Sequence, residues 1–94
     1  MAESIIQRDM SCCYICGSTQ NLEEHHCIHG TANRKLAEKY KLKVRLCWCH
    51  HRSNKGAHHD RELDLFLIRT AQQCFEEQIG DREMFRNEFG KSWL

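Results

Sequence analysis

The chain has 94 residues, seven of them cysteine and seven histidine, and its formal net charge is +1. This length accommodates one domain with a small apolar core, and an odd number of cysteines excludes a fully paired set of disulfides within one chain. No apolar run reaches the roughly 18 residues of a membrane span, and the polar first ten residues do not resemble a signal peptide. We therefore expect a reduced, cytoplasmic protein in which bound zinc compensates for the small core.

The first third of the chain predicts loops and one short strand. Residues 1–11 are expected to form a flexible lead, and residues 12–94 a single domain. Residues 12–30 are rich in cysteine, histidine and glycine, which favours turns and short strands over a helix. Within them, residues 22–26 predict a short strand.

The middle of the chain predicts a short helix and a second strand. Thr31 is the expected N-cap of a helix over residues 32–40. Residues 42–46 alternate apolar and basic side chains, which is typical of a half-buried strand. The basic face of this strand, formed by Lys43 and Arg45, is expected to face solvent.

The last third predicts two helices that cover the core and carry no chemistry of their own. Asp60 is expected to cap a long amphipathic helix that ends at Gly80, and Asp81 a shorter helix that ends at Gly90. Trp93 can then pack back onto the core. The apolar positions of the long helix follow a helical period: Leu63, Phe66, Leu67, Ala71, Cys74, Phe75 and Ile79.

Two cysteine-containing turns predict a zinc site. Cys13 and Cys16 form a CxxC turn, which supplies half of a tetrahedral site. Cys47 with His50 repeats the same spacing and gives three thiolates and one imidazole, whereas Cys47 with Cys49 gives four thiolates through a tighter turn. We favour Cys13, Cys16, Cys47 and His50, because a repeated turn has the simpler geometry. Cys12 is an alternative to Cys13 as a zinc ligand. Cys27 and Cys74 are expected to be buried hydrophobic residues.

Basic residues gather in the middle of the chain. Between residues 34 and 55, eight basic residues stand against one acidic residue, Glu38, so this segment carries +7 and the remainder −6. A basic surface on a nearly neutral protein indicates contact with phosphates. The expected nucleic-acid contacts are Arg34, Lys35, Lys43, Arg45, Arg52 and Lys55.

Three histidine pairs point to a second metal centre with catalytic potential. The pairs are residues 25–26, 50–51 and 58–59, and Glu24 precedes the first. At a strand end neighbouring side chains can reach one site, so one imidazole of a pair can bind a divalent cation while the other accepts a proton. A cation held by neutral imidazoles keeps positions open for water and a phosphate oxygen.

Together these motifs resemble the HNH endonucleases with an embedded zinc knuckle, especially a small group common in bacteriophages and prophages. The resemblance covers roughly residues 12–94, with the motifs Cys13-x-x-Cys16, Glu24-His25-His26, Val44-Arg45-Leu46-Cys47-x-x-His50-His51 and Gly56-Ala57-His58. It implies an α+β fold in which residues 12–59 form a zinc-stapled ββα-metal core with strands 22–26 and 42–46. Two additional helices over residues 60–94 would cover this core.

The resemblance also implies roles for the histidines. His26, the second residue of its pair, would be the general base, and His25 would bind the catalytic cation, which could be Mg²⁺, Mn²⁺, Ni²⁺ or Zn²⁺. A helix that carries the other ligands would pack against the strands. Those ligands would be His51 and His58, with His50 in place of His51 if Cys49 binds the structural zinc, and His59 as the less favoured neighbour of His58.

The chain departs from the family pattern in two places. The family often has a central asparagine upstream of the C-terminal histidines, where this chain has residues 41–42, and Asn33 and Asn54 are candidate substitutes. The interval from His51 to His58 exceeds one helical turn, so His58 is expected to approach from a loop or a distorted turn.

These patterns lead us to expect metal-dependent hydrolysis of phosphodiester bonds in DNA with low intrinsic sequence specificity. The alternative is a non-catalytic zinc-binding module that binds nucleic acid or a phage assembly partner, for example beside a DNA-packaging motor. The resemblance implies a phage or prophage protein in the cytoplasm of a bacterial host. We expect a monomer or small homo-oligomer with no membrane association.

Overall fold

A two-stranded antiparallel sheet lies at the centre of a small α+β fold. The computed structural model describes residues 4–54 and 56–94. Strand β1 (Leu22–His26) pairs with β2 (Lys43–Cys47), with His26 opposite Lys43 and Leu22 opposite Cys47. In the described residues four helices accompany the sheet: α1 (Thr31–Lys39), α2 (Trp48–His51), α3 (Arg61–Gln78) and α4 (Arg82–Phe89).

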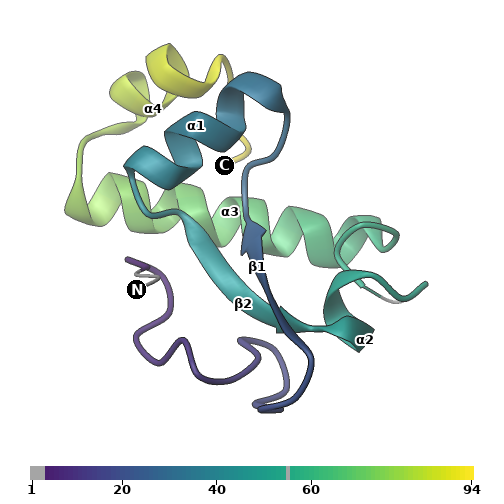
Figure 1. Cartoon of the computed structure of the whole chain (residues 1–94). Coiled ribbons are helices and arrows are strands. Elements are labelled where there is room, and N and C mark those ends of the chain that lie inside the picture. The colour runs from purple at the N-terminus through teal and green to yellow at the C-terminus, as the bar shows by residue number, and fades with distance from the viewer. Residues whose placement is uncertain (1–3, 55) are drawn as a thin grey trace.

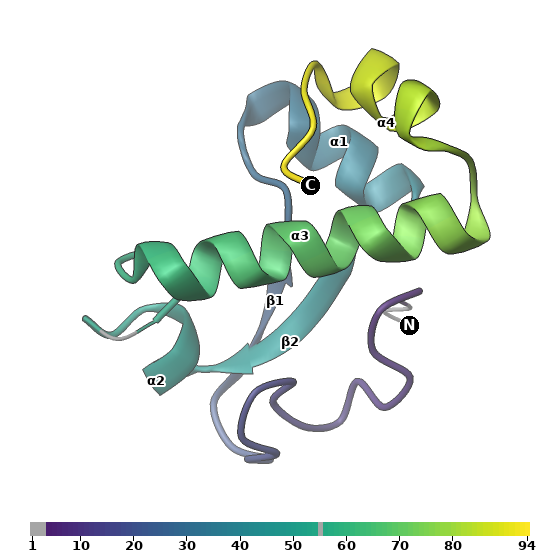
Figure 2. The same cartoon turned by 180° about the vertical axis from the view of Figure 1, so that it is seen from behind.

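The helices surround the sheet unevenly. Helix α3 spans the width of the molecule and crosses the sheet, while α1 and α4 lie together on one side of α3 (Figures 1 and 2). The short helix α2 continues directly from β2 at the other end of the sheet (Figure 1). The two strands and α2 thus form one end of the molecule, separate from α4.

The predicted caps of α3 and α4 are present, but the cap of α1 is not the predicted one. Asp60 accepts hydrogen bonds from the backbone of Glu62 and Leu63, and Asp81 caps α4 in the same way. Thr31 was expected to cap α1, yet it is the first residue of the helix and Gly30 is the N-cap. Gly30 has φ of 109°, a conformation that glycine adopts without steric cost, so the chain turns into α1 one residue early.

The apolar core joins α3 and α4. Phe75 and Phe85 are fully buried with their ring centroids 5.3 Å apart, and Trp93 packs on Phe85 as expected. Phe66 and Ile79 were wrongly expected in the core, since they are 51% and 36% exposed. Each residue turns an α-helix by about 100°, so these two side chains point away from the face of α3 that packs on the core. Leu67, Ala71 and Phe75 of the predicted stripe are buried, and Ile68 is a buried apolar residue of α3 that was not predicted.

Residues 4–11, which belong to the segment expected to be a flexible lead, contact the domain. Gln7 is 6% exposed, and its side-chain oxygen accepts a hydrogen bond of 2.8 Å from the backbone of Arg45 in β2. Its amide nitrogen donates to the carbonyl of Cys12 at 2.7 Å. Ile5 and Ile6 contact the apolar core. The segment is therefore part of the fold and supports the edge of β2.

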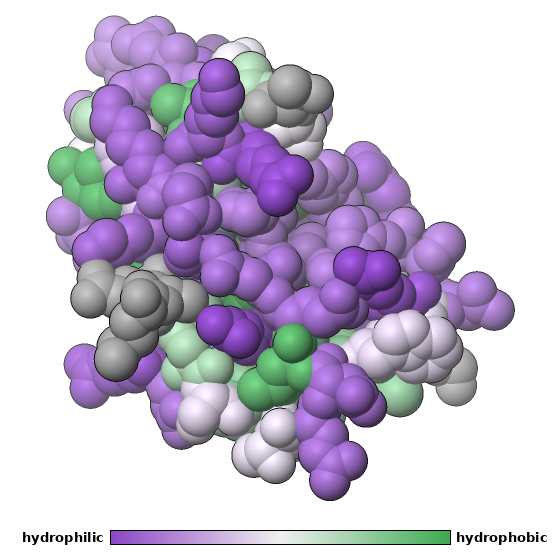
Figure 3. Space-filling model, in the orientation of Figure 1, coloured by the Kyte–Doolittle hydropathy of each residue, from purple (hydrophilic) through white to green (hydrophobic). Residues whose placement is uncertain are grey.

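The surface is largely hydrophilic on the face shown in Figure 3, where hydrophobic residues lie in small patches. Within residues 4–54 and 56–94, no helix is both long enough and apolar enough to cross a membrane.

Candidate metal centres and cleft

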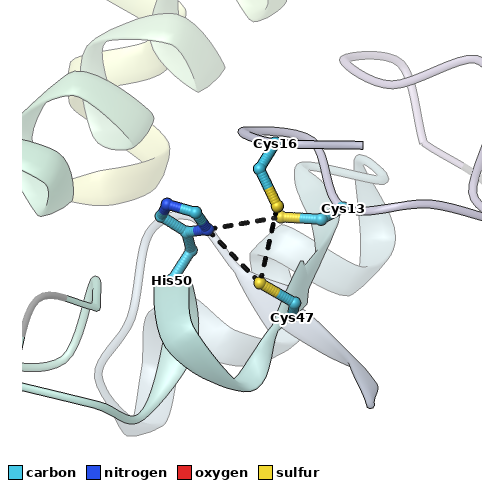
Figure 4. Close-up of side chains that lie close together, drawn as sticks. All are labelled: Cys13, Cys16, Cys47 and His50. Carbon is cyan, nitrogen blue, oxygen red and sulfur yellow. Dashed lines mark hydrogen bonds between the residues drawn. The ribbon is translucent and has the colours of Figure 1, made fainter. Parts of the chain in front are cut away.

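Three cysteines and one histidine from two distant segments form a tetrad. The thiols of Cys13 and Cys16 come from the loop before β1, and Cys47 and His50 come from the junction of β2 and α2 (Figure 4). The Sγ atoms of Cys16 and Cys47 are 3.7 Å apart, and Nδ1 of His50 is 3.3 Å from Cys47 Sγ and 3.9 Å from Cys13 Sγ. All four ligand atoms lie within 4.8 Å of one another.

These separations fit a tetrahedral zinc ion. Zn–S and Zn–N bonds of about 2.3 and 2.0 Å place two sulfurs about 3.8 Å apart, and a sulfur and a nitrogen about 3.5 Å apart. The observed distances lie close to both values. Cys49, the alternative ligand, is exposed and lies outside the tetrad. The donor set in place is therefore three thiols and one imidazole, which can hold a structural zinc ion.

The local backbone shapes the first half of the tetrad. Gly17 has φ of 79° and donates to the carbonyl of Cys13 at 2.9 Å, which closes the turn. The backbone of Tyr14 donates to Arg45 at 2.8 Å and so attaches this turn to β2.

The thiol of Cys13 lies in an environment that favours a thiolate. Burial by itself raises the pKa of this thiol, but hydrogen bonds from the backbone of Cys47, Cys16 and Ile15, together with one from the Cys16 side chain, lower its pKa to about 6. Because zinc binds the thiolate, this lowered pKa reduces the cost of metal binding at neutral pH.

A second cluster consists of three imidazoles. His25 lies in β1, His51 is the last residue of α2, and His58 lies in the turn that follows. The ring of His25 lies 5.2 Å from that of His51 and 5.3 Å from that of His58, and the Nε2 atoms of His51 and His58 are 2.9 Å apart. We refer to His25, His51 and His58 as the histidine triad.

The histidine triad has the properties of an open cation site. His25 Nε2 is buried and lacks a hydrogen-bond partner among the residues that the structure describes. Burial and the neighbouring histidines lower the pKa of His25 to about 3, so the ring is neutral at pH 7, the form that binds metal. His51 Nδ1 is 3.3 Å from a Glu23 carboxylate oxygen, which leaves Nε2 of His51 for a cation. The three imidazoles, with the unpartnered nitrogen of His25 among them, could therefore hold a metal ion.

Gly56 brings His58 to the triad. A Cβ atom at position 56 would lie 2.6 Å from the carbonyl carbon of His51, so the turn passes too close to α2 for any larger residue. The backbone N–H of His58 donates to the carbonyl of His51 at 3.3 Å. The expectation that one helix carries both histidines was wrong, because α2 ends at His51. His58 comes from the turn, as the interval between the two histidines predicted.

A cleft of about 490 Å³ connects the histidine triad with His26. His26 is the last residue of β1, where its side chain reaches the same opening as that of His25. The residues that line the cleft are Glu24, His25, His26, His29, Gly30, Arg34, His51, Arg52 and His58.

A carboxylate holds one nitrogen of His26. His26 Nε2 is 2.8 Å from an oxygen of Glu38 in α1, and the Lys43 ammonium donates to the other Glu38 oxygen at 2.6 Å. Lys43 also pairs with Glu24 at 2.9 Å. The hydrogen bond from Lys43, and then that from His26, keep the pKa of Glu38 below its usual value. Glu38 therefore stays ionised and fixes the His26 ring, which leaves Nδ1 as the nitrogen that no carboxylate engages.

Lys43 does not have the exposed position that was expected of a phosphate contact. It was expected on a solvent-facing strand surface, but its side chain is only 7% exposed and is held by Glu24 and Glu38. Two carboxylates around one ammonium stabilise it in this position, so it is not available to a ligand in the cleft.

The other basic residues differ in their positions. Arg34 and Arg52 line the cleft, and Arg52 pairs with Glu23 at 2.8 Å. Lys35 is exposed on α1 and Arg45 is half-buried in β2. Lys55 lies outside the described residues.

Two carboxylates of the site were missed from the sequence. Glu23 lies two residues before His25, and this spacing places both side chains on one face of a strand, a pattern that could have identified it. Glu38 has no such pattern, since it contacts His26 from another element. Asn33, a proposed substitute for the family asparagine, donates instead to the His29 carbonyl at 3.3 Å.

The site and fold together define a small α+β protein with a cysteine–histidine tetrad that can hold a structural zinc ion. Neither a family model, nor a curated protein, nor a solved structure matches the chain.

Proposed function

We propose that this protein is an HNH-type endonuclease that hydrolyses phosphodiester bonds of DNA with the help of a divalent cation. One observation carries the proposal: His26 and the histidine triad line a single cleft, beside Arg34 and Arg52. A base, a cation site and positive charge are components that metal-dependent hydrolysis of a phosphodiester uses. The resemblance of the sequence motifs to that family supports the same proposal.

His26 accepts the proton of the attacking water. Glu38 holds Nε2 of this ring at 2.8 Å, so Nδ1 is the atom that receives the proton. Once His26 is protonated, the Glu38 carboxylate stabilises the imidazolium. General-base catalysis of this kind contributes about 10²- to 10⁴-fold to a rate.

The histidine triad and Arg52 in the cleft have separate roles in this proposal. His25, His51 and His58 would hold the cation, which when bound supplies positive charge to the phosphate and leaving oxygens. Glu23 contacts both His51 and Arg52, at 3.3 and 2.8 Å, and so keeps the arginine beside the triad. Because arginine contacts to phosphates carry no sequence information, we expect low sequence specificity.

Plasmid cleavage by two histidine variants tests the base. His26→Ala should lower the cleavage rate in Mg²⁺, Mn²⁺ or Ni²⁺ by at least about 100-fold, with an unchanged melting temperature. The matched control is His59→Ala, an exposed histidine that does not line the cleft. Full activity of His26→Ala would exclude it as the base.

A metal count separates the endonuclease from a non-catalytic zinc module. The endonuclease should bind one zinc ion that resists dialysis and a second, exchangeable divalent cation that His51→Ala removes. A single zinc ion, no exchangeable site and no cleavage would favour a module that binds nucleic acid or a phage assembly partner.

A further inference from the structure

Trp48 is a large aromatic residue that folding leaves exposed. It is the first residue of α2, and 54% of it is accessible to solvent. Trp48 lines two hollows of about 630 and 370 Å³. The larger hollow also contains Ser18, Gln20 and Asn21, and the smaller one contains Asn54. A flat apolar ring therefore stands beside amide and hydroxyl groups that can form hydrogen bonds.

Trp48 lies in the chain between two residues of the tetrad. Its neighbour Cys47 and the nearby His50 both belong to the tetrad, so bound zinc would fix the backbone on both sides of Trp48. A ligand that stacks on the indole would thus meet a preorganised surface, which reduces the entropy cost of binding.

Arg52 connects this surface to the cleft. It lines the cleft with the histidine triad and also both hollows beside Trp48. The backbone N–H of Arg52 donates to the carbonyl of Trp48 at 2.9 Å, which is one turn of helix between the two residues. A strand whose phosphate lies against Arg52 in the cleft would extend directly over the indole.

We propose that Trp48 is a stacking platform for an unpaired nucleobase of single-stranded DNA, next to the phosphate that is cut. Bases stack on aromatic side chains regardless of sequence, and the amides beside Trp48 can accept or donate at the edge of a base. A base within a duplex is already stacked on both faces and is not available to the indole. The preferred substrate is therefore single-stranded or locally opened DNA. This inference rests on the proposed function for the identity of the ligand.

The test measures binding apart from cleavage. In the His26→Ala background, zinc-loaded protein is titrated with fluorescently labelled oligothymidylate and with a blunt duplex of equal length, and anisotropy gives each Kd. Adding Trp48→Ala should weaken oligothymidylate binding by about tenfold and leave duplex binding within about twofold, since one stacked base is lost. Trp48→Phe should restore most of the affinity. Phe66→Ala, which removes another exposed aromatic residue, should change neither Kd.

Each outcome bears on a different claim. Unchanged oligothymidylate affinity in Trp48→Ala, or an equal loss for the duplex, would overturn the stacking platform even if the wild-type protein cuts DNA. Binding that depends on Trp48 in a protein that never cuts DNA would support the platform and overturn only the endonuclease. Absence of any oligothymidylate binding by the wild-type fold would overturn the platform.

Discussion

The tetrad and the histidine triad use similar donors in opposite ways. In the tetrad, four side chains of the chain itself face one another and complete a tetrahedron, so no ligand position remains open. In the histidine triad, three imidazoles face a cleft that is open to solvent and to His26. Closed zinc sites of four protein ligands are typically structural, whereas three-ligand sites with an open position are typically catalytic. Donor number and access, more than donor chemistry, thus distinguish the closed tetrad from the open histidine triad in this molecule.

The strongest way to test this difference is to replace two adjacent histidines. His50→Ala removes a tetrad ligand and should abolish cooperative thermal unfolding, because structural zinc contributes about 10–16 kcal/mol in small zinc domains. His51→Ala should keep one zinc per chain and a cooperative transition. It should weaken binding of the exchangeable cation by more than about 100-fold, which exceeds the usual effect of losing a residue that only orients a ligand. Circular dichroism melts and metal analysis measure both. Similar melting of the two variants would remove the distinction between the clusters.

Gly56→Ala should impair the histidine triad alone. The added Cβ meets the His51 backbone at 2.6 Å, so the turn must move and take His58 with it. We expect a loss of about 1–3 kcal/mol in unfolding free energy, as for overpacked sites, and a cleavage rate lowered by at least about tenfold. Chemical denaturation and a plasmid assay measure the two effects. Asn54→Ala, in the same loop, is the control, and equal activity of both variants would show that the turn does not position His58.

Replacement of Glu38 should lower the cleavage rate without changing metal binding by the tetrad or by the histidine triad. Glu38→Ala frees the His26 ring, and we expect kcat to fall by about 10- to 100-fold, the usual effect of removing an orienting partner. Glu38→Gln keeps a hydrogen-bond acceptor and should recover part of the rate. Steady-state cleavage of a short labelled DNA separates kcat from KM. A change in KM alone would assign Glu38 to substrate binding instead.

The smallest expected effect is a difference in thiol labelling. In the zinc-loaded protein, iodoacetamide should modify exposed Cys49 and leave the three tetrad thiols protected. Cys27 should stay unmodified because burial raises its pKa and closes access. Mass spectrometry counts the adducts, and a chelator should add the modification of Cys13, Cys16 and Cys47. Protection of Cys49 by zinc would mean that it replaces His50 in the tetrad.

How far the sequence predicts this structure depends on the range of the contacts involved. The strand over residues 22–26 and the caps at Asp60 and Asp81 follow from local patterns, and the structure contains them. The tetrad was predictable because each half has a fixed spacing within a turn. Glu38 beside His26 and Gln7 beside Arg45 were not predictable. Each of these pairs joins segments whose register is set by tertiary packing, which leaves no periodic trace in the chain.

Contacts between distant segments also explain why the sequence predicts an exposed Lys43 and the structure has a buried one. An alternating strand predicts that Lys43 faces outward, and alternation is correct for the backbone. The lysine is nevertheless covered, because Glu38 and Glu24 from neighbouring elements close over its ammonium group. Side-chain exposure therefore depends on partners that a strand pattern alone does not contain.

The direct adjacency of His50 and His51 constrains how this chain can evolve. One peptide bond separates a tetrad ligand from a ligand of the histidine triad, and both depend on the four residues of α2. Insertion or deletion of a residue between Cys47 and His51 would rotate the helix by about 100° per residue and detach one cluster or the other. Point substitutions at exposed positions such as Trp48 or Cys49 leave this register intact. Variation in this segment should therefore occur by substitution and not by changes in length.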